Sequence, residues 1–480
     1  MATACAGELA CRPAAALSPL PRRGGRGDAT PSPMPARQAP SRWRQLRRRT
    51  PLSWAPMVTA ASRRQVIVRM ASAEAGGAGA VEGNDPAPCS VERSAAFSKL
   101  AGAAGVTMDL QLLSSGPPRN SGLFSSVEAA RGQVLMEVPR AACLTVDYVA
   151  GLSLPSEGQW PNLIEGLNRD EPLPWDLLLA LALVDAKMGE GGAFWGEYVA
   201  SVLPGEEELS VPFCLPPGVL PEFQHAALQA GAEAQRERLA ALFPGLASPR
   251  ATGGLPPLLR TYALVRSRAF RASEDSFAFV PFLDAANHAP DPNADFRRDD
   301  AGVWQLVALR DIAVGEEVCI SYTGEEGYTN RRLMAQYGFV PSEGNPADRI
   351  DLEEDLGLSA EQLAGKQLSG SKLEAAVGPD LASMASGQNV YLFSTIRSLP
   401  LVDDEQQPLT GTEQFAELLL EKCKHALEAF PTTLEEDSAT LSTLSASGPE
   451  RAMAAATAYR LQRKQLLSCA RGLLERYLKL

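Results

Sequence analysis

Short stretches of alternating apolar and polar residues mark two strand-rich regions of the chain. The first lies between Met108 and Val138, where the turn residues of Gly116–Pro118 and Asn120–Gly122 interrupt the alternation. The second comprises three stretches, Phe277–Val280, Trp304–Leu309 and Glu317–Tyr322. Two strand-rich regions so far apart in the sequence indicate one β unit that is split by an insertion.

Helical periodicity fills the sequence between these regions and after them. Trp175–Met188 is apolar on most faces, which is typical of a buried helix, whereas Glu222–Phe243 is amphipathic. Pro257–Phe270 begins a third helix, with proline in its first turn. Further helices are expected at Asn330–Gln336, Thr412–Phe430 and Glu450–Leu480. The pattern predicts an α+β protein, in which a β-fold is split by a helical insertion and followed by an all-α C-terminal domain.

The composition is that of a globular protein with room for two or three domains. Among 480 residues, 45% are apolar and 21% are charged, which excludes wholesale disorder. No apolar run approaches the roughly 18 residues that a membrane helix needs, so we expect no membrane partner. The net charge of −12 argues against nucleic acid as the partner of the whole surface.

The charge is distributed unevenly, because the first 70 residues are basic. They contain thirteen Arg, no Lys and only two acidic residues, and the remaining chain carries a net charge of −23. An Arg-rich, acid-poor segment with serine is typical of an organelle transit peptide, and its many prolines favour the chloroplast over the mitochondrion. A basic tail that binds nucleic acid or acidic surfaces is the alternative. We therefore predict a chloroplast transit peptide at 1–70, a flexible linker at 71–94, and a stromal location.

Cysteine and histidine offer little metal chemistry. The eight cysteines form no C-x-x-C pair, and the three histidines, His225, His288 and His425, are far apart. We therefore predict no metal site and no disulfide framework. Phosphate-loop, nucleophile-elbow and H-E-x-x-H motifs are also absent from the sequence.

Four short polar segments between Arg266 and Phe339 remain as candidate chemistry. They are Arg266–Phe270, Asp284–His288 with Asn293 downstream, Ser321–Tyr322 and Gln336–Phe339. Each has an ordinary structural interpretation: Arg268 as a surface ion pair, Asn287 and His288 as a turn, and Tyr322 and Tyr337 as half-buried core residues. The occurrence of all four segments together favours a functional site over these separate structural roles.

Together these segments resemble the SET-domain protein methyltransferases, and specifically the plant Rubisco large-subunit methyltransferase-like group. Asp284–His288 is similar to the D-x-x-N-H of that group, and Ser267–Phe270 to its S-R-x-F. The segments Asn287–Asn293 and Asn330–Phe339 match the two stretches that thread past each other in the SET fold.

The resemblance extends from Phe97 to Leu480 and implies the domain boundaries. Phe194–Tyr198 with Leu203-Pro204 is similar to a motif of the helical insertion in this group, and Ala458–Leu461 with Lys464 and Leu466 to a signature of its C-terminal substrate-binding domain. The expected boundaries are 95–342 for the SET domain, with its insertion at about 155–256, and 343–480 for the C-terminal domain.

The activity that the resemblance implies is methyl transfer from S-adenosyl-L-methionine to a protein lysine. The amine must lose its proton to become a nucleophile, although lysine is protonated near neutral pH. Desolvation and the nearby sulfonium charge both disfavour the ammonium form. Tyrosine side chains meet this need, because their rings face a cation and their hydroxyl groups align the amine for in-line attack.

The resemblance also implies a role for each residue. Tyr322 and Tyr337 line the lysine channel, and Tyr322 is the first choice for the catalytic tyrosine. Arg268 lies between the cofactor carboxylate and the substrate, and Asp284 contacts the substrate. His288 and Asn287 bind the cofactor, and His288 does so as a positioned binding residue and not as a general base. Phe339 packs against the cofactor.

The N-terminal cofactor loop departs from the group's E-G-x-G or G-x-G pattern. Of Arg119–Leu123, only Gly122 matches it, while Asn120 and Leu123 complete the expected cofactor contacts. Asn tolerates left-handed backbone angles, and the contacts in this loop are largely main-chain, so the loop can still form. The loop Thr323–Thr329 between the tyrosine segments is slightly longer than usual.

Two rival hypotheses stay open at this level. Relatives of the group methylate histidine, and a SET scaffold can dock a partner without catalysis. The leading hypothesis is a monomeric plastid enzyme whose partner is an abundant stromal protein, such as the Rubisco large subunit or an aldolase. Because the chain is acidic, we expect it to bind a basic segment of that partner.

Overall fold

The structure is a computed structural model that describes most of the chain after residue 90. The described residues are 91–115, 121–147, 151–154, 173–188, 192–248, 254–273, 275–323, 327–378, 380, 389–402 and 411–480. The predicted transit peptide, most of the predicted linker and Asn120 lie outside them. Helix α3 (Val91–Ala103) begins inside the predicted linker, because Phe97 and Leu100 bury one of its faces.

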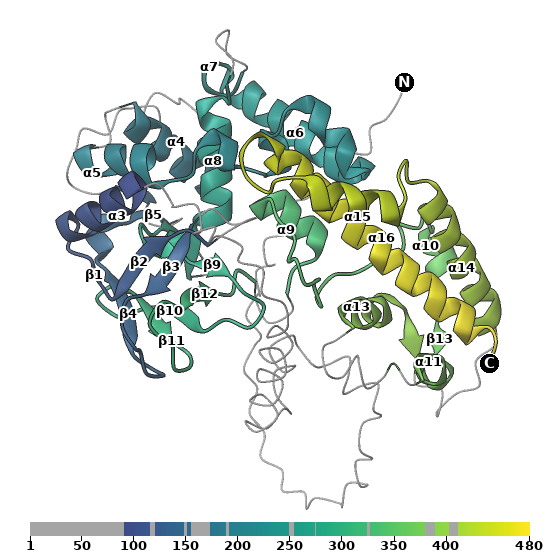
Figure 1. Cartoon of the computed structure of the whole chain (residues 1–480). Coiled ribbons are helices and arrows are strands. Elements are labelled where there is room, and N and C mark those ends of the chain that lie inside the picture. The colour runs from purple at the N-terminus through teal and green to yellow at the C-terminus, as the bar shows by residue number, and fades with distance from the viewer. Residues whose placement is uncertain are drawn as a thin grey trace, which may run out of the picture. The chain divides into compact units, whose positions relative to one another are not determined.

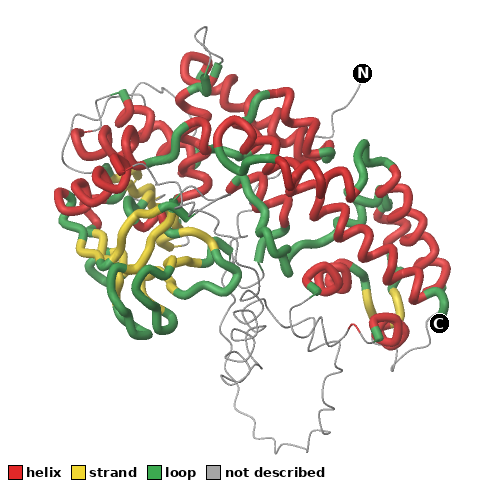
Figure 2. Tube along the Cα trace, in the orientation of Figure 1, coloured by secondary structure: helices red, strands yellow, loops and turns green. Residues whose placement is uncertain are grey.

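Three small sheets form the β region (Figures 1 and 2). The first has the order β1-β4-β11-β10, with bounds Thr107–Met108, Val134–Val138, Trp304–Ala308 and Ala294–Arg298. The second has the order β2-β3-β12-β9, with bounds Leu110–Leu113, Gly122–Ser125, Glu317–Ile320 and Asn287–His288. The third has the order β6-β5-β8-β7, with bounds Gly151–Ser153, Leu144–Asp147, Ser276–Phe279 and Phe270–Ser273. Every sheet joins strands from both sides of the insertion, as the sequence predicts.

The pairing around β12 brings the polar segments together. This strand pairs antiparallel with β3 and parallel with β9, so that Cys319 lies opposite Asn287 and Ile320 opposite His288. Asn293 reinforces the strand from the side: its Oδ1 accepts from Cys319 N at 2.8 Å, and its Nδ2 donates to Glu317 O at 2.8 Å. The buried Asn293 therefore holds β12 in place and is not part of an open site.

The insertion is helical. Its helices are α4 (Trp175–Lys187), α5 (Gly192–Glu197), α6 (Ala226–Leu242) and α7 (Pro244–Ala247), and α8 (Pro257–Arg268) leads back to the β region. The helix predicted from Glu222 begins only at Ala226, because Pro217–Phe223 forms a 3-10 segment that contains Pro221. Helix α4 is buried almost all round and packs on α8, as its apolar sequence predicts.

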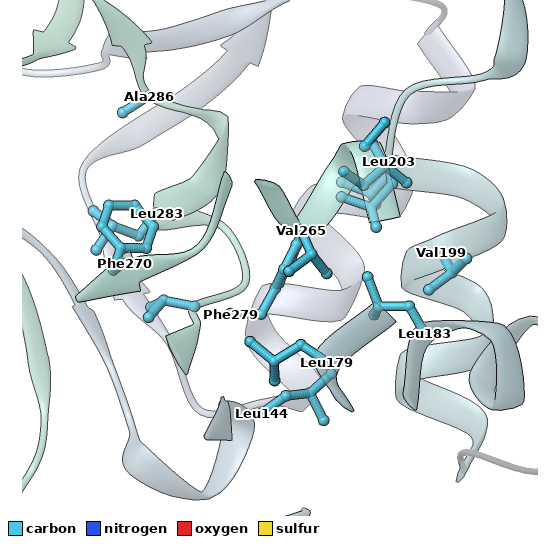
Figure 3. Packing of buried hydrophobic residues seen from close by; sticks show 14 of the residues in the cluster. Leu144, Leu179, Leu183, Val199, Leu203, Val265, Phe270, Phe279, Leu283 and Ala286 are labelled. Carbon is cyan, nitrogen blue, oxygen red and sulfur yellow. The ribbon is translucent and has the colours of Figure 1, made fainter. Parts of the chain in front are cut away.

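The insertion and the sheets share one hydrophobic core (Figure 3). Figure 3 shows Leu179 and Leu183 of α4 beside Val265 of α8, with Leu144 of β5 and Phe279 of β8 nearby. All five side chains are fully buried. The end of α8, where Arg268 lies, is therefore anchored by packing on both the helical and the β side.

The C-terminal region has a second core of its own. Its helices are α10 (Ala360–Leu363), α11 (Gly370–Val377), α13 (Val390–Ser398), α14 (Thr412–Glu428), α15 (Leu434–Thr443) and α16 (Arg451–Tyr477). Helix α16 packs against α11, α13, α14 and α15, and α14 runs beside it in Figure 1. The region is not purely helical, because β13 (Leu368–Ser369) and β14 (Leu401–Val402) form a short parallel pair.

The predicted order of a split β region, a helical insertion and a helical C-terminal region is confirmed. Within the described residues, no helix combines the length and the apolar character that crossing a membrane requires.

Candidate active site

Four aromatic side chains meet where β9, β12 and α9 (Asn330–Tyr337) end. Tyr322 follows β12, Tyr337 is the last residue of α9, Phe339 follows it, and His288 belongs to β9. The ring centroids of Tyr322 and Tyr337 lie 4.9 Å apart, and His288 lies 5.3 Å from Tyr322. Phe339 is 6.1–6.4 Å from the other three rings. Both tyrosines and Phe339 are half-buried, so the cluster keeps part of its surface open.

Hydrogen bonds hold Tyr322, Tyr337 and His288 in this arrangement. The Tyr322 hydroxyl donates to Ala286 O at 2.7 Å, and the Tyr337 hydroxyl donates to Tyr322 O at 3.3 Å. The backbone N–H of Tyr322 donates to His288 Nδ1 at 3.1 Å, so that nitrogen serves as an acceptor. Burial, with the nearby Tyr328 and Tyr322, raises the pKa of Tyr337 above its ordinary value. At neutral pH, Tyr337 is therefore a hydrogen-bond donor and not a base.

Gly338 makes the turn that places Phe339 beside Tyr337. It caps α9 with φ of +77°, a conformation that residues with a side chain rarely adopt. A Cβ atom there would lie 2.6 Å from backbone atoms of Ser210 and Val211. The motif Tyr337-Gly338-Phe339 therefore depends on glycine for two independent reasons.

Arg268 approaches the same site from the end of α8. Its Nη1 donates to Asp284 O at 2.7 Å and lies 3.2 Å from Asp284 Oδ2. Its side chain is 24% exposed, and within the described residues its Nε and Nη2 groups have no hydrogen-bond acceptor. Three N–H groups of a guanidinium thus remain available to an anionic ligand.

Asp284 does not present its carboxylate outward. Its side chain is 1% exposed, with Arg268 on Oδ2 and the Tyr198 hydroxyl on Oδ1 at 2.5 Å. Burial raises the pKa of Asp284, although Arg268 and the hydrogen bond from Tyr198 act in the opposite direction. Direct contact between this carboxylate and a substrate, which the resemblance implies, conflicts with this geometry, because both oxygens are engaged inside the protein.

Asn287 connects Ser121 of the predicted cofactor loop to Ser115 and Glu317. Its Nδ2 lies within hydrogen-bonding distance of Glu317 Oε1 (2.7 Å), Ser121 O (2.9 Å) and Ser115 Oγ (3.2 Å). Ser115 also donates to Glu317 Oε1 at 2.9 Å. The Asn287 side chain therefore holds Ser115, Ser121 and Glu317 together, while residues 116–120 lie outside the described part of the chain.

Gly122 allows this close arrangement. A Cβ atom on it would lie 2.4 Å from both Glu317 Oε1 and Ser115 Oγ, and 2.6 Å from Asn287 Nδ2. The one glycine that the loop retains is thus the one that the hydrogen-bond network requires. Leu123 is fully buried in the core, so only its backbone is available to a ligand.

The structure brings together Arg268, Asp284, Asn287, His288, Tyr322, Tyr337 and Phe339 in one region, as the sequence predicts. The contributions of Tyr198, Glu317 and Ser115 were not predicted from the sequence. Only Tyr198 carried a signal, because it ends the Phe194–Tyr198 motif. Glu317 and Ser115 were not detectable, since their partner Asn287 is distant in sequence.

A separate cavity of about 210 Å³ lies where α9 and the segment 348–355 meet α16. Its lining includes His225, Asp348, Tyr459 and Arg463. His225 Nδ1 lies 2.6 Å from the Tyr459 hydroxyl, and its Nε2 lies 3.2 Å from Glu354 Oε1. Burial raises the pKa of Asp348 to about 7 and lowers that of His225 to about 4.

Beside this cavity, a buried ion network ties α16 to the insertion. Asp437 is fully buried and accepts from Lys464 Nζ at 2.5 Å and from Arg460 Nε at 2.9 Å. Arg460 also pairs with Glu222 at 2.8 Å. Burial favours the neutral acid, but hydrogen bonds from Lys464, Thr432 and Arg460 outweigh it and lower the pKa of Asp437. These groups satisfy one another inside the protein.

Family comparisons agree with this architecture. Residues 120–323 match the family model of the SET domain, and residues 385–467 match the model described as Rubisco LSMT substrate-binding. The two matches cover much of the split β region with its insertion, and much of the C-terminal region. The predicted resemblance to SET-domain methyltransferases of this group is confirmed.

Individual relatives are distant. SET domain-containing protein 4 of Mus musculus is 28% identical over 279 residues, which cover 52% of this chain and 59% of the mouse protein. The chloroplastic ribulose-1,5-bisphosphate carboxylase/oxygenase large subunit N-methyltransferase of Nicotiana tabacum is 24% identical, with 67% of this chain and 69% of that protein covered. A crystal structure of the SET domain of LSMT bound to lysine and AdoHcy superposes with a TM-score of 0.52 at 18% identity, covering 81% of this chain and 92% of that one. The fold is shared.

Proposed function

We propose that this protein is an S-adenosylmethionine-dependent protein-lysine N-methyltransferase. The observation that carries the proposal is the half-open aromatic cluster of Tyr322, Tyr337 and Phe339 beside Arg268, three of whose N–H groups have no acceptor among the described residues. The tobacco relative is an N-methyltransferase by name, and the structurally similar LSMT binds lysine and AdoHcy. Both support the same activity here.

The residues present fit the methyl donor. Arg268 would hold its carboxylate through Nε and Nη2, because Nη1 is already committed to Asp284. The backbone around Gly122 and the Asn287–Glu317 pair would hold it from the β3 side, and Phe339 would pack against it. When bound, S-adenosylmethionine supplies an electrophilic methyl group on a sulfonium.

Tyr322 and Tyr337 would line the channel for the acceptor amine. Their rings favour a cationic ligand, and partial burial favours the neutral amine over the ammonium form. The Tyr322 hydroxyl is fixed through Ala286 O, so its oxygen is a positioned acceptor for an amine N–H. His288 fixes the Tyr322 backbone and needs no proton transfer of its own.

The protein partner and the location belong to the same proposal. The acceptor is a lysine on an abundant plastid stromal protein, such as the Rubisco large subunit, and the enzyme acts as a monomer. The chloroplastic tobacco relative and the Arg-rich first 70 residues support plastid import. The region 343–480 serves as the domain that docks the protein substrate, which the match at 385–467 supports.

The test is incubation of the full chain with labelled S-adenosylmethionine and plastid stromal extract, followed by mass mapping of the labelled residue. Label on a lysine is the expected result. Label on a histidine, or no label from a folded protein that fails to bind S-adenosylmethionine in calorimetry, would overturn the proposal.

A single substitution tests the assigned catalytic residue. Tyr322→Phe should lower the rate of transfer at least a hundredfold, because the aligned hydroxyl is lost, whereas cofactor affinity should change little. Cofactor affinity and thermal stability, measured on the same sample, separate loss of chemistry from loss of structure. Equal rates in the variant and the wild type would remove Tyr322 from the mechanism.

A further inference from the structure

Tyr198 is a buried tyrosine whose hydroxyl bridges two groups next to the candidate active site. It lies at the start of a π-helical segment (Tyr198–Val202) in the insertion, and its side chain is fully buried. The hydroxyl donates to Asp284 Oδ1 at 2.5 Å and accepts from Phe282 N at 2.7 Å. Both hydrogen-bonding roles of the hydroxyl are therefore used, and both lead to the segment that carries Asp284.

Phe282 shows why this segment needs support. Its φ of +71° is unusual for a residue with a bulky side chain and costs conformational energy. Its ring is fully buried and packs edge-on against Tyr198 at 5.2 Å and Phe97 at 5.1 Å. The aromatic contacts hold the ring, and the Tyr198 hydroxyl satisfies the backbone N–H, so the turn before Asp284 is held at two points.

Asp284 connects this supported turn to Arg268. Its carboxylate lies between the Tyr198 hydroxyl and Arg268 Nη1, and its backbone carbonyl accepts from the same Nη1. A guanidinium is planar, so two acceptors on Nη1 determine the direction in which Nε and Nη2 point. Charged groups near Arg268 are Asp284 and Glu208, and Glu208 is itself paired with Arg93.

We infer that Tyr198 and Asp284 are positioning residues that orient the Arg268 guanidinium toward the carboxylate of the bound methyl donor. The inference rests on the proposed function and deepens it. It assigns to Asp284 the role of holding Arg268, in place of substrate contact, and it gives a physical role to the Phe194–Tyr198 motif. The affected step is recognition of the donor carboxylate and not the chemistry of transfer.

The chain contains a matched control. Tyr262, on the same helix as Arg268, also donates its hydroxyl to a buried carboxylate, Asp176 Oδ2 at 2.9 Å, which pairs with Arg266 at 3.2 Å. Tyr262→Phe and Tyr198→Phe therefore delete the same atom from the same kind of Tyr–Asp–Arg arrangement. Only the Tyr198 arrangement ends on Arg268, the arginine that is proposed to hold the donor carboxylate.

The experiment is calorimetry on the full chain with two ligands, S-adenosylmethionine and decarboxylated S-adenosylmethionine. Tyr198→Phe should weaken S-adenosylmethionine binding about tenfold or more, since a buried charge-assisted hydrogen bond is lost, and leave the decarboxylated ligand within about twofold of wild type. In an Arg268→Ala background, Tyr198→Phe should have no further effect. Tyr262→Phe should change the affinity for neither ligand.

Several outcomes would overturn the inference. Equal losses for both ligands would mean a general structural effect, and unchanged S-adenosylmethionine affinity would mean that Tyr198 does not position Arg268. If Tyr198→Phe does not fold, Asp284→Asn replaces it, because asparagine keeps the Oδ1 acceptor and loses the charge facing Arg268. It should show the same selectivity for the carboxylate. Failure of the wild type to bind S-adenosylmethionine would instead contradict the proposed function.

Discussion

The aromatic site and the junction between α16 and the insertion use the same residue types in opposite ways. At the site, Tyr322 and Tyr337 are half-buried, and Arg268 keeps three N–H groups without an acceptor in the described residues. At the junction, Arg460 and Lys464 are almost fully buried and bonded to the buried Asp437. Polar groups that are fully satisfied inside a protein contribute to its specific structure, whereas unsatisfied groups at the surface of a site are available to ligands. The difference separates residues that hold regions of the chain together from residues that keep polar groups open to a ligand.

The comparison changes the meaning of the C-terminal signature. Tyr459, Arg460 and Lys464 match a substrate-binding domain in sequence, yet all three are buried and bonded to other parts of the chain. Tyr459 contacts His225, and Arg460 contacts Glu222, both outside the C-terminal region. These three residues of the signature therefore attach this region to other parts of the chain, including the insertion.

The largest effect on stability is expected from Asp437→Ala. The substitution leaves Arg460 and Lys464 buried with their shared counter-charge removed, which should cost about 3–5 kcal/mol of unfolding free energy. Urea unfolding of the full chain measures the loss. Replacing Asp437 and Lys464 together by Leu and Met should recover much of it. A loss below about 1 kcal/mol for the single variant would mean that the network is not truly buried.

Gly338→Ala tests the turn of the aromatic site and should have the next largest effect. The new Cβ meets backbone atoms at 2.6 Å in addition to an unfavourable φ, so we expect a loss of more than about 2 kcal/mol together with impaired transfer. Gly132→Ala is the control, because Gly132 has φ of +88° with no atom within 4 Å of its Cβ position. It should cost only about 1 kcal/mol. Equal losses would show that the close approach to Ser210 is absent.

His225→Gln should make a smaller, pH-dependent difference at the junction. Burial lowers the pKa of His225 to about 4 from an ordinary value of about 6.5, so the unfolded chain binds the proton more readily. The stability that neutral His225 contributes is thus present above pH 6.5 and is lost as the pH falls toward 4. The difference in unfolding free energy between wild type and variant should be about 1 kcal/mol at pH 7.5, and should shrink and then change sign as the pH falls toward 4. A constant difference would contradict the assigned pKa.

The variant must be compared with the wild type at each pH, because Asp348 lines the same cavity and its pKa is raised, whereas that of His225 is lowered. Its raised pKa makes the folded state gain protons, and relative stability, as the pH falls from about 7. In the wild type alone the two contributions partly cancel.

The smallest effect is expected from Glu475→Ala. Glu475 lies on α16 and faces Lys424 of α14 at 3.8 Å, with both side chains exposed. Solvent screens such a pair, so the unfolding free energy should change by less than about 0.5 kcal/mol. Because Lys464 and Glu475 share one helix, the contrast with Asp437→Ala isolates burial as the cause. A large loss would mean that α14 and α16 depend on this surface pair.

Much of the site was predictable from local sequence. Asn287 and His288 follow an apolar segment, and Tyr337 ends a short helix, as the sequence predicts. Tyr322 was expected to end a strand and instead lies just after β12, which ends at Ile320. The inward orientation of the Asp284 carboxylate, toward Tyr198 and Arg268, was not predictable. Its partner Tyr198 lies 86 positions away, and sequence motifs do not report which way a carboxylate faces. Glu317 was missed for the same reason, since it meets Asn287 only through the pairing of β9 with β12.

The sequence by itself determined the split β region, the helical insertion, the helical C-terminal region and the residue types gathered at the site. Apolar periodicity, turn residues and short motifs are local properties, so they can be recognised in the sequence before the fold is known. Only the tertiary structure decided which polar atoms are consumed inside the protein and which stay open to a ligand. Asp284, Tyr459 and Lys464 are turned inward, while Arg268 keeps N–H groups that no described residue accepts from, because burial and hydrogen-bond partners are set by segments far apart in the chain.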